Sequence, residues 1–425
     1  MHRVTTLPSG LRVASEHMDG VRSVSVGFWI DAGARDERAD QRGLAHFIEH
    51  MLFKGGARHD ATAIAELFDE LGAELNAATA KDSTLVYARV LDDHLPLALD
   101  VMADMLRSPS WSEMEQEKEV VLEEIAMVED QPQEVVHDLA TLAMFGDDDP
   151  LGHPILGDPS VISTAGVANV AEFHRAAYRD PSIVLAAAGN VDHDALCELA
   201  ASLLGSAPAT PDLPHRPSAG GQLPGRRFQQ KDTEQFHVCV CGPGLARADD
   251  DRFALSLLDV ILGGTASSRL FQEIRERRGM AYSVYSYHSA YAECGQVGVY
   301  VGTRPENLDE CLSIVRSETA SLAAGELRPG ELERAKRHLT GRVLLALEST
   351  SARMSRLGKN LLSDTEILEP DEVSRRVEAV TPEQIAALAA RLWAPENLSA
   401  AGIGPDEGAF DAAVAEACPT LQPAA

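Results

Sequence analysis

The sequence predicts an α+β protein made of two domains. Strand-like and helix-like segments are mixed along the chain without the strict alternation that a parallel sheet with crossover helices requires. At 425 residues the chain is too long for one typical hydrophobic core. It also carries a proline-rich break close to its middle, with a faint repeat on the two sides of that break.

The break is the segment "SAPATPDLPHRPSAGGQLPG", residues 206–225, which holds five prolines among small and polar residues. Such a composition is typical of a solvated linker. We therefore expect a first domain over residues 1–205 and a second over residues 226–425.

The repeat consists of a strand, a polar turn and an amphipathic helix, at residues 85–106 and again at 298–322. A second, charged helix follows each copy, at residues 112–130 and 329–349. This order predicts that the two domains have similar folds.

The strands of the first domain are predicted from residue patterns. Residues 23–33, "SVSVGFWIDAG", alternate and indicate a half-buried strand, and residues 73–80 and 83–90 read as two further strands.

Two helices separate these strands. We expect the first helix over residues 44–54 and the second over residues 60–72. Asp60 is the predicted N-cap of the second helix, and Gly72 is predicted to end it.

Composition and charge limit the possible partners and location. The net charge of −29 argues against nucleic acid and anionic membrane as partners, and it is compatible with cationic peptides, although solubility alone explains it as well. No apolar run approaches the roughly 18 residues of a membrane span. The N-terminus lacks the apolar region of a secretory signal, so we expect a cytoplasmic protein.

The stretch "GLAHFIEHMLFKG", residues 43–55, carries the strongest chemical signal. On a helix, His46 and His50 lie one turn apart on one face, where two imidazoles can reach one ion. Glu49 lies at the edge of that face, where a carboxylate can act as a base beside the metal. This is the H-x-x-E-H order of inverted zincins. The alternative is a pair of hydrogen-bonded core histidines, so a metal site needs a third ligand.

The charged helix at 112–130 supplies candidates for that ligand. Ser112 and Glu115 have capping-box spacing, which accounts for Glu115. Glu117 and Glu124 are seven residues apart and therefore point the same way. Glu124 lies near an apolar stripe, where an unpaired carboxylate is costly unless a metal binds it. The alternative is a solvated acidic face paired with a lysine. The residues of the stripe are Val120, Val121 and Ile125.

The sequence resembles the insulinase/pitrilysin family of inverted-motif zinc peptidases, in its short branch related to mitochondrial processing peptidase. The resemblance rests on "HFIEH", on "EKEVVLEEI", on "LGAELNAATAKDSTLVY" between them, and on "SSRLFQEIRERRGMAYSVYSY" in the second half. It extends from residue 7 to about residue 393, and such dispersed agreement is far more specific than the five-residue motif.

The resemblance implies roles in the first domain. His46, His50 and Glu124 would bind one Zn²⁺ per chain, with Glu49 as the general base on a water molecule and Glu117 as a supporting glutamate. The repeat places Ala335 and Arg342 opposite the two glutamates of the charged helix, and no H-x-x-E-H occurs after residue 50, so only the first domain can hold the metal.

The resemblance also implies substrate contacts. Asn76 and Ala77 match an edge strand that pairs with the peptide backbone, and Arg275 and Tyr282 match a pair from the second domain that reaches the substrate. Tyr282 would donate a hydrogen bond to the oxyanion, with Arg275 helping to anchor the substrate. The alternative for Tyr282 is a place in the core of an aromatic strand.

In such a family the two domains are antiparallel sheets covered by helices, which face each other around a chamber like a clamshell. The implied activity is cleavage of extended, unstructured peptides, by a homodimer or by a heterodimer with an inactive relative. Two alternatives remain open: a scaffold or partner subunit without catalysis, and a metal-dependent hydrolase of a non-peptide bond.

Overall fold

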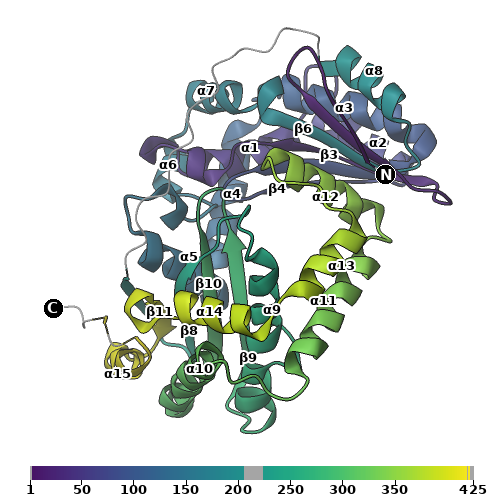
Figure 1. Cartoon of the computed structure of the whole chain (residues 1–425). Helices are drawn as coiled ribbons and strands as arrows, with labels where there is room; N and C mark the ends of the chain where they lie inside the picture. Colours follow the sequence, from purple (N-terminus) through teal and green to yellow (C-terminus); the bar gives the residue numbers. More distant parts are fainter. Residues whose placement is uncertain (1, 205–223, 419, 422–425) are drawn as a thin grey trace. The chain divides into compact units, whose positions relative to one another are not determined.

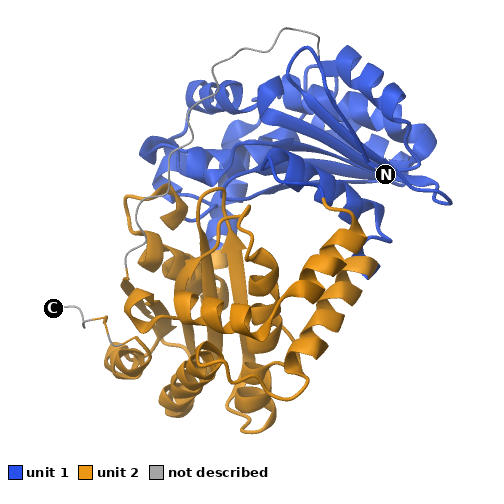
Figure 2. Cartoon of the chain, viewed as in Figure 1, with its two compact units in different colours: residues 1–126, 154–217, 345–367 blue, residues 127–153, 218–344, 368–425 orange. Residues whose placement is uncertain are grey.

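The structure is a computed structural model that describes residues 2–204, 224–418 and 420–421. The chain divides into two compact units, coloured separately in Figure 2. The ranges of unit 1 are 1–126, 154–217 and 345–367, and those of unit 2 are 127–153, 218–344 and 368–425.

Unit 1 contains a six-stranded sheet with the order β1-β2-β6-β3-β5-β4, so β4 and β1 are its two edges. Strands β3, β4 and β6 of this sheet are labelled in Figure 1. Neighbouring strands are antiparallel except β2 and β6, which are parallel. The strands are β1 (His2–Thr6), β2 (Arg12–His17), β3 (Ser23–Ile30), β4 (Glu74–Thr79), β5 (Thr84–Leu91) and β6 (Ile183–Gly189). The helices are α1 (Leu44–Leu52), α2 (Ala61–Glu70), α3 (Leu95–Arg107), α4 (Met114–Glu129, which continues into unit 2 after residue 126), α6 (Pro159–Thr164), α7 (Val167–Ala177), α8 (His193–Leu204) and α12 (Thr350–Leu362).

The central strands of unit 1 are buried on both faces. Along β6, Leu185 and Ala187 belong to one core cluster, whereas Val184 and Ala186 belong to a second. The first cluster lies against α1, α3 and α8, and the second lies under α12. Strand β3 is therefore fully buried over most of its length, and the prediction of a half-buried strand is wrong because α12 covers its second face.

Specific contacts fix α12 on this sheet. Ser25 on β3 hydrogen-bonds Thr350 with 2.8 Å between the hydroxyl oxygens, and the buried Glu16 on β2 forms ion pairs with Arg353 and Arg356. These polar contacts supplement the apolar contact of the second cluster.

Unit 2 contains a five-stranded sheet with the order β7-β11-β8-β10-β9. Here too one pair, β11 with β7, is parallel and the others are antiparallel. The strands are β7 (Arg226–Gln230), β8 (Phe236–Gly244), β9 (Ala281–Ala290), β10 (Gly295–Thr303) and β11 (Ser399–Gly404). The helices are α5 (Pro132–Phe145), α9 (Arg252–Leu262), a π-helix (Phe271–Glu276), α10 (Leu308–Ala323), α11 (Glu331–Ala346), α13 (Pro370–Ala379), α14 (Pro382–Leu392) and α15 (Glu407–Ala417).

The two sheets share one strand order, β2-β6-β3-β5-β4 in unit 1 and β7-β11-β8-β10-β9 in unit 2. The parallel pair occupies the same place in each. The α+β class and the predicted repeat are therefore confirmed. The sheets are antiparallel as expected, except for one parallel pair of strands in each.

The compact units are not contiguous halves of the chain. Residues 127–153, with α5, belong to unit 2, where α5 packs on β8 and β11, and residues 345–367, with α12, belong to unit 1. The predicted domains 1–205 and 226–425 differ from the units at these two segments. Each sheet has two apolar faces, and the exchanged helix covers the second one. The predicted linker at 206–225 lies outside the described residues except for its last two positions.

Candidate metal centre and active site

Helix α1 begins at a glycine turn and a buried carboxylate. Gly43 has a φ of 96°, and a Cβ there would lie 2.7 Å from the carbonyl oxygen of Leu156, so only glycine fits. The carboxylate of Glu37 accepts hydrogen bonds from the backbone N–H groups of Gly43 (2.7 Å) and Ala45 (2.6 Å), which satisfies donors at the helix start. Burial raises the pKa of Glu37 to about 8. Glu37 was not singled out from the sequence, because no sequence signal indicates its role.

Helices α1 and α4 bring His46, His50 and Glu124 together, with one ligand atom of each within 4.8 Å of the others. Oε2 of Glu124 lies 3.3 Å from Nε2 of His50 and 3.7 Å from Nε2 of His46. Ligand atoms of a tetrahedral zinc site with bonds near 2.0–2.2 Å are about 3.3–3.6 Å apart. The donor set and the distances of Glu124 to the two histidines therefore fit Zn²⁺.

The two histidines are held differently. Burial, with a smaller contribution from His50, lowers the pKa of His46 to about 4, so its imidazole is neutral at pH 7 and can offer a lone pair. Within the described ranges no hydrogen-bond partner reaches its buried Nδ1 atom. The Nδ1 atom of His50, in contrast, lies 2.8 Å from Oε1 of Glu117. An ionised carboxylate only accepts, so this nitrogen carries the proton and leaves Nε2 free as a ligand.

Glu117 lies between His50 and Lys54. It is 5% exposed, and its Oε2 atom lies 2.6 Å from the ammonium of Lys54. The two predicted partners on α4, Glu117 and Glu124, both contact the same histidine, as their seven-residue spacing requires. Lys54, two residues beyond the end of α1, was not singled out from the sequence.

Glu49 lies beside the cluster and contacts the edge strand. The hydroxyl of Thr79, the last residue of β4, donates a hydrogen bond of 2.5 Å to Oε2 of Glu49. Burial raises the pKa of Glu49, and the hydrogen bond from Thr79 opposes that shift. A carboxylate with a raised pKa is a stronger base for proton transfer near neutral pH. Thr79 was not singled out as a partner of the base.

Strand β4 places Asn76 and Ala77 on an edge of the sheet. Its pairing with β5 runs from Glu74 opposite Arg89 to Thr79 opposite Thr84, and no further strand follows it in the sheet order among the described residues. Asn76 is exposed, and its side-chain oxygen accepts from the N–H of Ala77. An unpaired edge can accept an extended peptide.

Arg275 and Tyr282 lie in unit 2, at the π-helix and at the start of edge strand β9. The guanidinium carbon of Arg275 is 4.5 Å from the centroid of the Tyr282 ring, in cation–π geometry. Tyr282 is 78% exposed, which excludes the alternative that it belongs to the core.

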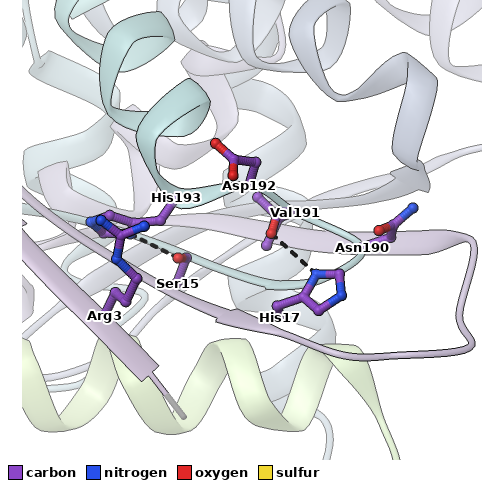
Figure 3. Close-up of a pocket in the computed structure, with 7 residues that line it drawn as sticks. All are labelled: Arg3, Ser15, His17, Asn190, Val191, Asp192 and His193. Atoms are coloured by element: carbon purple, nitrogen blue, oxygen red, sulfur yellow. Dashed lines mark hydrogen bonds between the residues drawn. The ribbon is translucent and has the colours of Figure 1, made fainter.

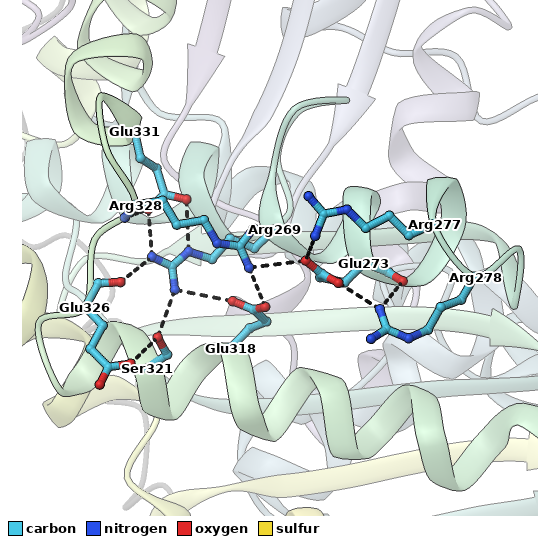
Figure 4. Close-up of polar contacts among 9 residues, drawn as sticks. All are labelled: Arg269, Glu273, Arg277, Arg278, Glu318, Ser321, Glu326, Arg328 and Glu331. Carbon is cyan, nitrogen blue, oxygen red and sulfur yellow. Dashed lines mark hydrogen bonds and ion pairs between the residues drawn. The ribbon is translucent and has the colours of Figure 1, made fainter.

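An ion network fixes the segment that carries Arg275 (Figure 4). Arg269 is 1% exposed and donates to both oxygens of Glu331, at 2.9 and 2.6 Å, and to Glu318 at 3.3 Å. Glu273, within the π-helix, pairs with three further arginines of this network. They are Arg277, Arg278 and Arg328. Because Arg269 lies two residues before the π-helix and Glu273 lies within it, these contacts tie the helix to α10 and α11.

The start of α4 differs from its prediction. The helix begins at Met114, the Ser112 hydroxyl contacts that of Ser110 at 2.7 Å, and Glu115 pairs with Lys118 at 2.8 Å. The predicted capping box is therefore wrong, because the chain turns at Glu113, whose φ is 62°, before the helix starts.

A cavity of about 380 Å³ lies beside strands β1 and β2 and the start of α8 (Figure 3). The ring nitrogens of His193 contact the hydroxyls of Thr5 (2.9 Å) and Ser15 (2.8 Å), and Arg3 pairs with Asp194 at 2.7 Å. The side chains of His193 and Arg3 at this cavity are therefore already hydrogen-bonded or ion-paired within the protein. It lies at the β1 side of the sheet, whereas Thr79 and Glu49 meet at β4.

Fold and site together define a two-unit α+β protein with a candidate H-x-x-E-H metal centre in unit 1. Comparisons with known proteins agree with this class. The model of the insulinase family, peptidase family M16, matches residues 12–159, and that of the peptidase M16 inactive domain matches residues 165–339. The chain is 43% identical over 398 residues to an uncharacterized zinc protease of Streptomyces coelicolor, covering 91% of this chain and 86% of the relative. It is 37% identical over 406 residues to an uncharacterized zinc protease of Bacillus subtilis, covering 94% and 97%.

Solved structures show the same fold. A protease from Helicobacter pylori has a TM-score of 0.88 at 20% identity, covering 95% of this chain and 99% of that one. A peptidase M16 inactive domain from Pseudomonas fluorescens has a TM-score of 0.88 at 24% identity, covering 96% and 98%. The chain belongs to the insulinase family, peptidase family M16. Among the described helices, none has the length and apolar character to span a membrane.

Proposed function

We propose that this protein is a zinc-dependent endopeptidase that cuts extended, unstructured peptides. The observation that carries the proposal is the meeting of His46, His50 and Glu124 beside the carboxylate of Glu49. These three residues would hold one Zn²⁺ per chain. The names of the relatives, which are zinc proteases, support the same reading.

The chemistry divides between the ion and the side chains. When bound, a zinc ion supplies Lewis-acid polarisation of the peptide carbonyl and lowers the pKa of water toward about 7. Glu49 accepts a proton from the attacking water and later passes it to the leaving amine. The hydrogen bond from Thr79 holds the Glu49 carboxylate in place during both transfers.

Strand β4 supplies the peptide-binding edge in this proposal. The backbone of an extended substrate pairs with residues Asn76 to Thr79, which brings it to the strand end where Thr79 contacts Glu49. Backbone pairing gives affinity with little side-chain selectivity, and a folded protein cannot present such a strand. The net charge of −29 favours cationic peptides among them.

Tyr282 and Arg275 complete the proposal from unit 2. The exposed Tyr282 hydroxyl donates a hydrogen bond to the developing oxyanion, and Arg275 holds the ring through the cation–π contact. We further propose that the protein acts as a dimer, either with a second copy of itself or with an inactive relative. The mass of the purified protein in solution tests this proposal.

The decisive experiment compares cleavage of an unstructured peptide by the wild type and by Glu49→Gln, with zinc quantified in both. We expect one zinc per chain in each protein and a fall in kcat of about 10²–10⁴-fold in the variant, because only proton transfer is removed. Glu119→Gln, an exposed acid on α4, is the matched control and should cleave normally.

Other outcomes point to other functions. Equal cleavage rates in the wild type and Glu49→Gln would show that Glu49 is not the general base. A metal-free wild type that binds a partner tightly without cleavage would support the scaffold alternative, which the match to an inactive-domain model keeps relevant. Cleavage of small esters without any cleavage in a peptide library would support the non-peptide hydrolase.

A further inference from the structure

Lys54 follows the end of α1 and makes a close contact with Glu117 on α4. Its Nζ atom lies 2.6 Å from Oε2 of Glu117, while Oε1 of the same carboxylate lies 2.8 Å from Nδ1 of His50. The three side chains form a linear series in which each oxygen of the central carboxylate has one partner.

This ion pair differs from an ordinary surface pair. The side chain of Glu117 is 6% exposed and that of Lys54 is 28% exposed. Exposed pairs contribute little because water competes and both side chains are free to move. A carboxylate that is almost fully buried needs partners for both of its oxygens, and leaving one of them unpaired is costly.

The series reaches the metal centre through His50 only. The Nδ1 atom of His50 is oriented by Glu117, whereas Nδ1 of His46 has no partner among the described residues. The direction of the Nε2 lone pair of His50 therefore depends on where the Glu117 carboxylate is fixed, and its outer oxygen is fixed by Lys54.

We propose that Lys54 is a positioning residue for the metal centre, which holds Oε2 of Glu117 so that Oε1 meets His50, and thereby raises the affinity of the site for zinc. The inference rests on the proposed zinc site and adds a residue outside its ligand set. Lys54 binds neither metal nor substrate in this role. It acts through Glu117 and then through His50.

The test measures zinc affinity by chelator competition in the full chain, with no activity readout needed. Lys54→Met retains the length of the stem and removes the ammonium, and it should weaken zinc binding about tenfold, the lower end of the range for partners of metal ligands. Lys54→Arg retains a cation at the site and should recover most of the loss.

Two comparisons isolate the route of the effect. In the Glu117→Gln background, Lys54→Met should change the zinc affinity less than twofold, because the two residues act as one unit. Lys118→Met is the matched control, since Lys118 is a buried lysine paired with Glu115 on the same helix, and it should bind zinc as the wild type does. Melting of the metal-free proteins shows whether each variant is folded.

Each contrary outcome has a distinct meaning. A Lys54→Met affinity within twofold of the wild type overturns the inference and leaves the zinc site standing. An equal loss in Lys118→Met, or an undiminished loss in the Glu117→Gln background, also overturns it, because the effect then does not pass through Glu117. A wild type that binds no zinc removes the proposed function itself.

Discussion

Units 1 and 2 share a strand order but present different side chains at corresponding places. In unit 1, α1 carries His46 and His50, and α4 carries Glu124. In unit 2, the helix after the corresponding strand, α9, contains no histidine. The helix that corresponds to α4 is α11, which has Arg342 where the repeat aligns Glu124.

This difference shows that the fold alone does not make the site. Both units build the same sheet, with a helix over its second face, from different side chains. Among the described residues, only those of unit 1 place two imidazoles and a carboxylate where they can share an ion. Function therefore depends on a few side chains added to a common scaffold, and the contrast between the units can be tested residue by residue.

The largest expected effect is the loss of the carboxylate ligand. Glu124→Gln should reduce peptide cleavage by more than about 10³-fold and leave the purified protein with little zinc, because a neutral amide is a poor third ligand for the ion. Zinc content and kcat/KM measure the change. Arg342→Gln, at the aligned place in unit 2, is the control and should have no effect on either. Loss of zinc in both variants would contradict the conclusion that only unit 1 supplies metal ligands.

A smaller effect is expected from unit 2. Tyr282→Phe keeps the ring over Arg275 and removes only the hydroxyl, so it should lower kcat by about 10²-fold, as loss of an oxyanion donor does elsewhere. Zinc content should not change, because no metal ligand lies in unit 2 in the proposal. If kcat is unchanged, Tyr282 has no part in the chemistry and unit 2 contributes binding alone.

The smallest effect is expected at the contact between base and edge strand. Thr79→Val is nearly isosteric and removes the hydrogen bond to Glu49, which should cost about 1.5 kcal/mol, or about tenfold in kcat. Thr79→Ser retains a hydroxyl and should recover most of the rate. A valine variant with the wild-type kcat would show that burial alone positions Glu49.

Local sequence determined much of unit 1. The i, i+4 spacing of His46 and His50 fixes their common face once α1 forms, and the expected cap of α2 is present, with Asp60 accepting from the N–H of Ala63. The αL conformation of Gly72 after that helix was likewise predictable, with a φ of 59°. Such features depend on backbone hydrogen bonds and on residue spacing within a short segment, and these do not require contacts with distant parts of the chain.

Only the tertiary structure decided which distant groups meet. The contacts of Lys54 with Glu117 and of Thr79 with Glu49 join segments far apart in the sequence, and the exchange of α5 and α12 between the units does so as well. Helical periodicity also predicted that Val120 belongs to the apolar stripe of α4, but in the structure this residue is 50% exposed. The pattern of a helix shows which side chains share a face, but what covers that face depends on how the whole chain packs.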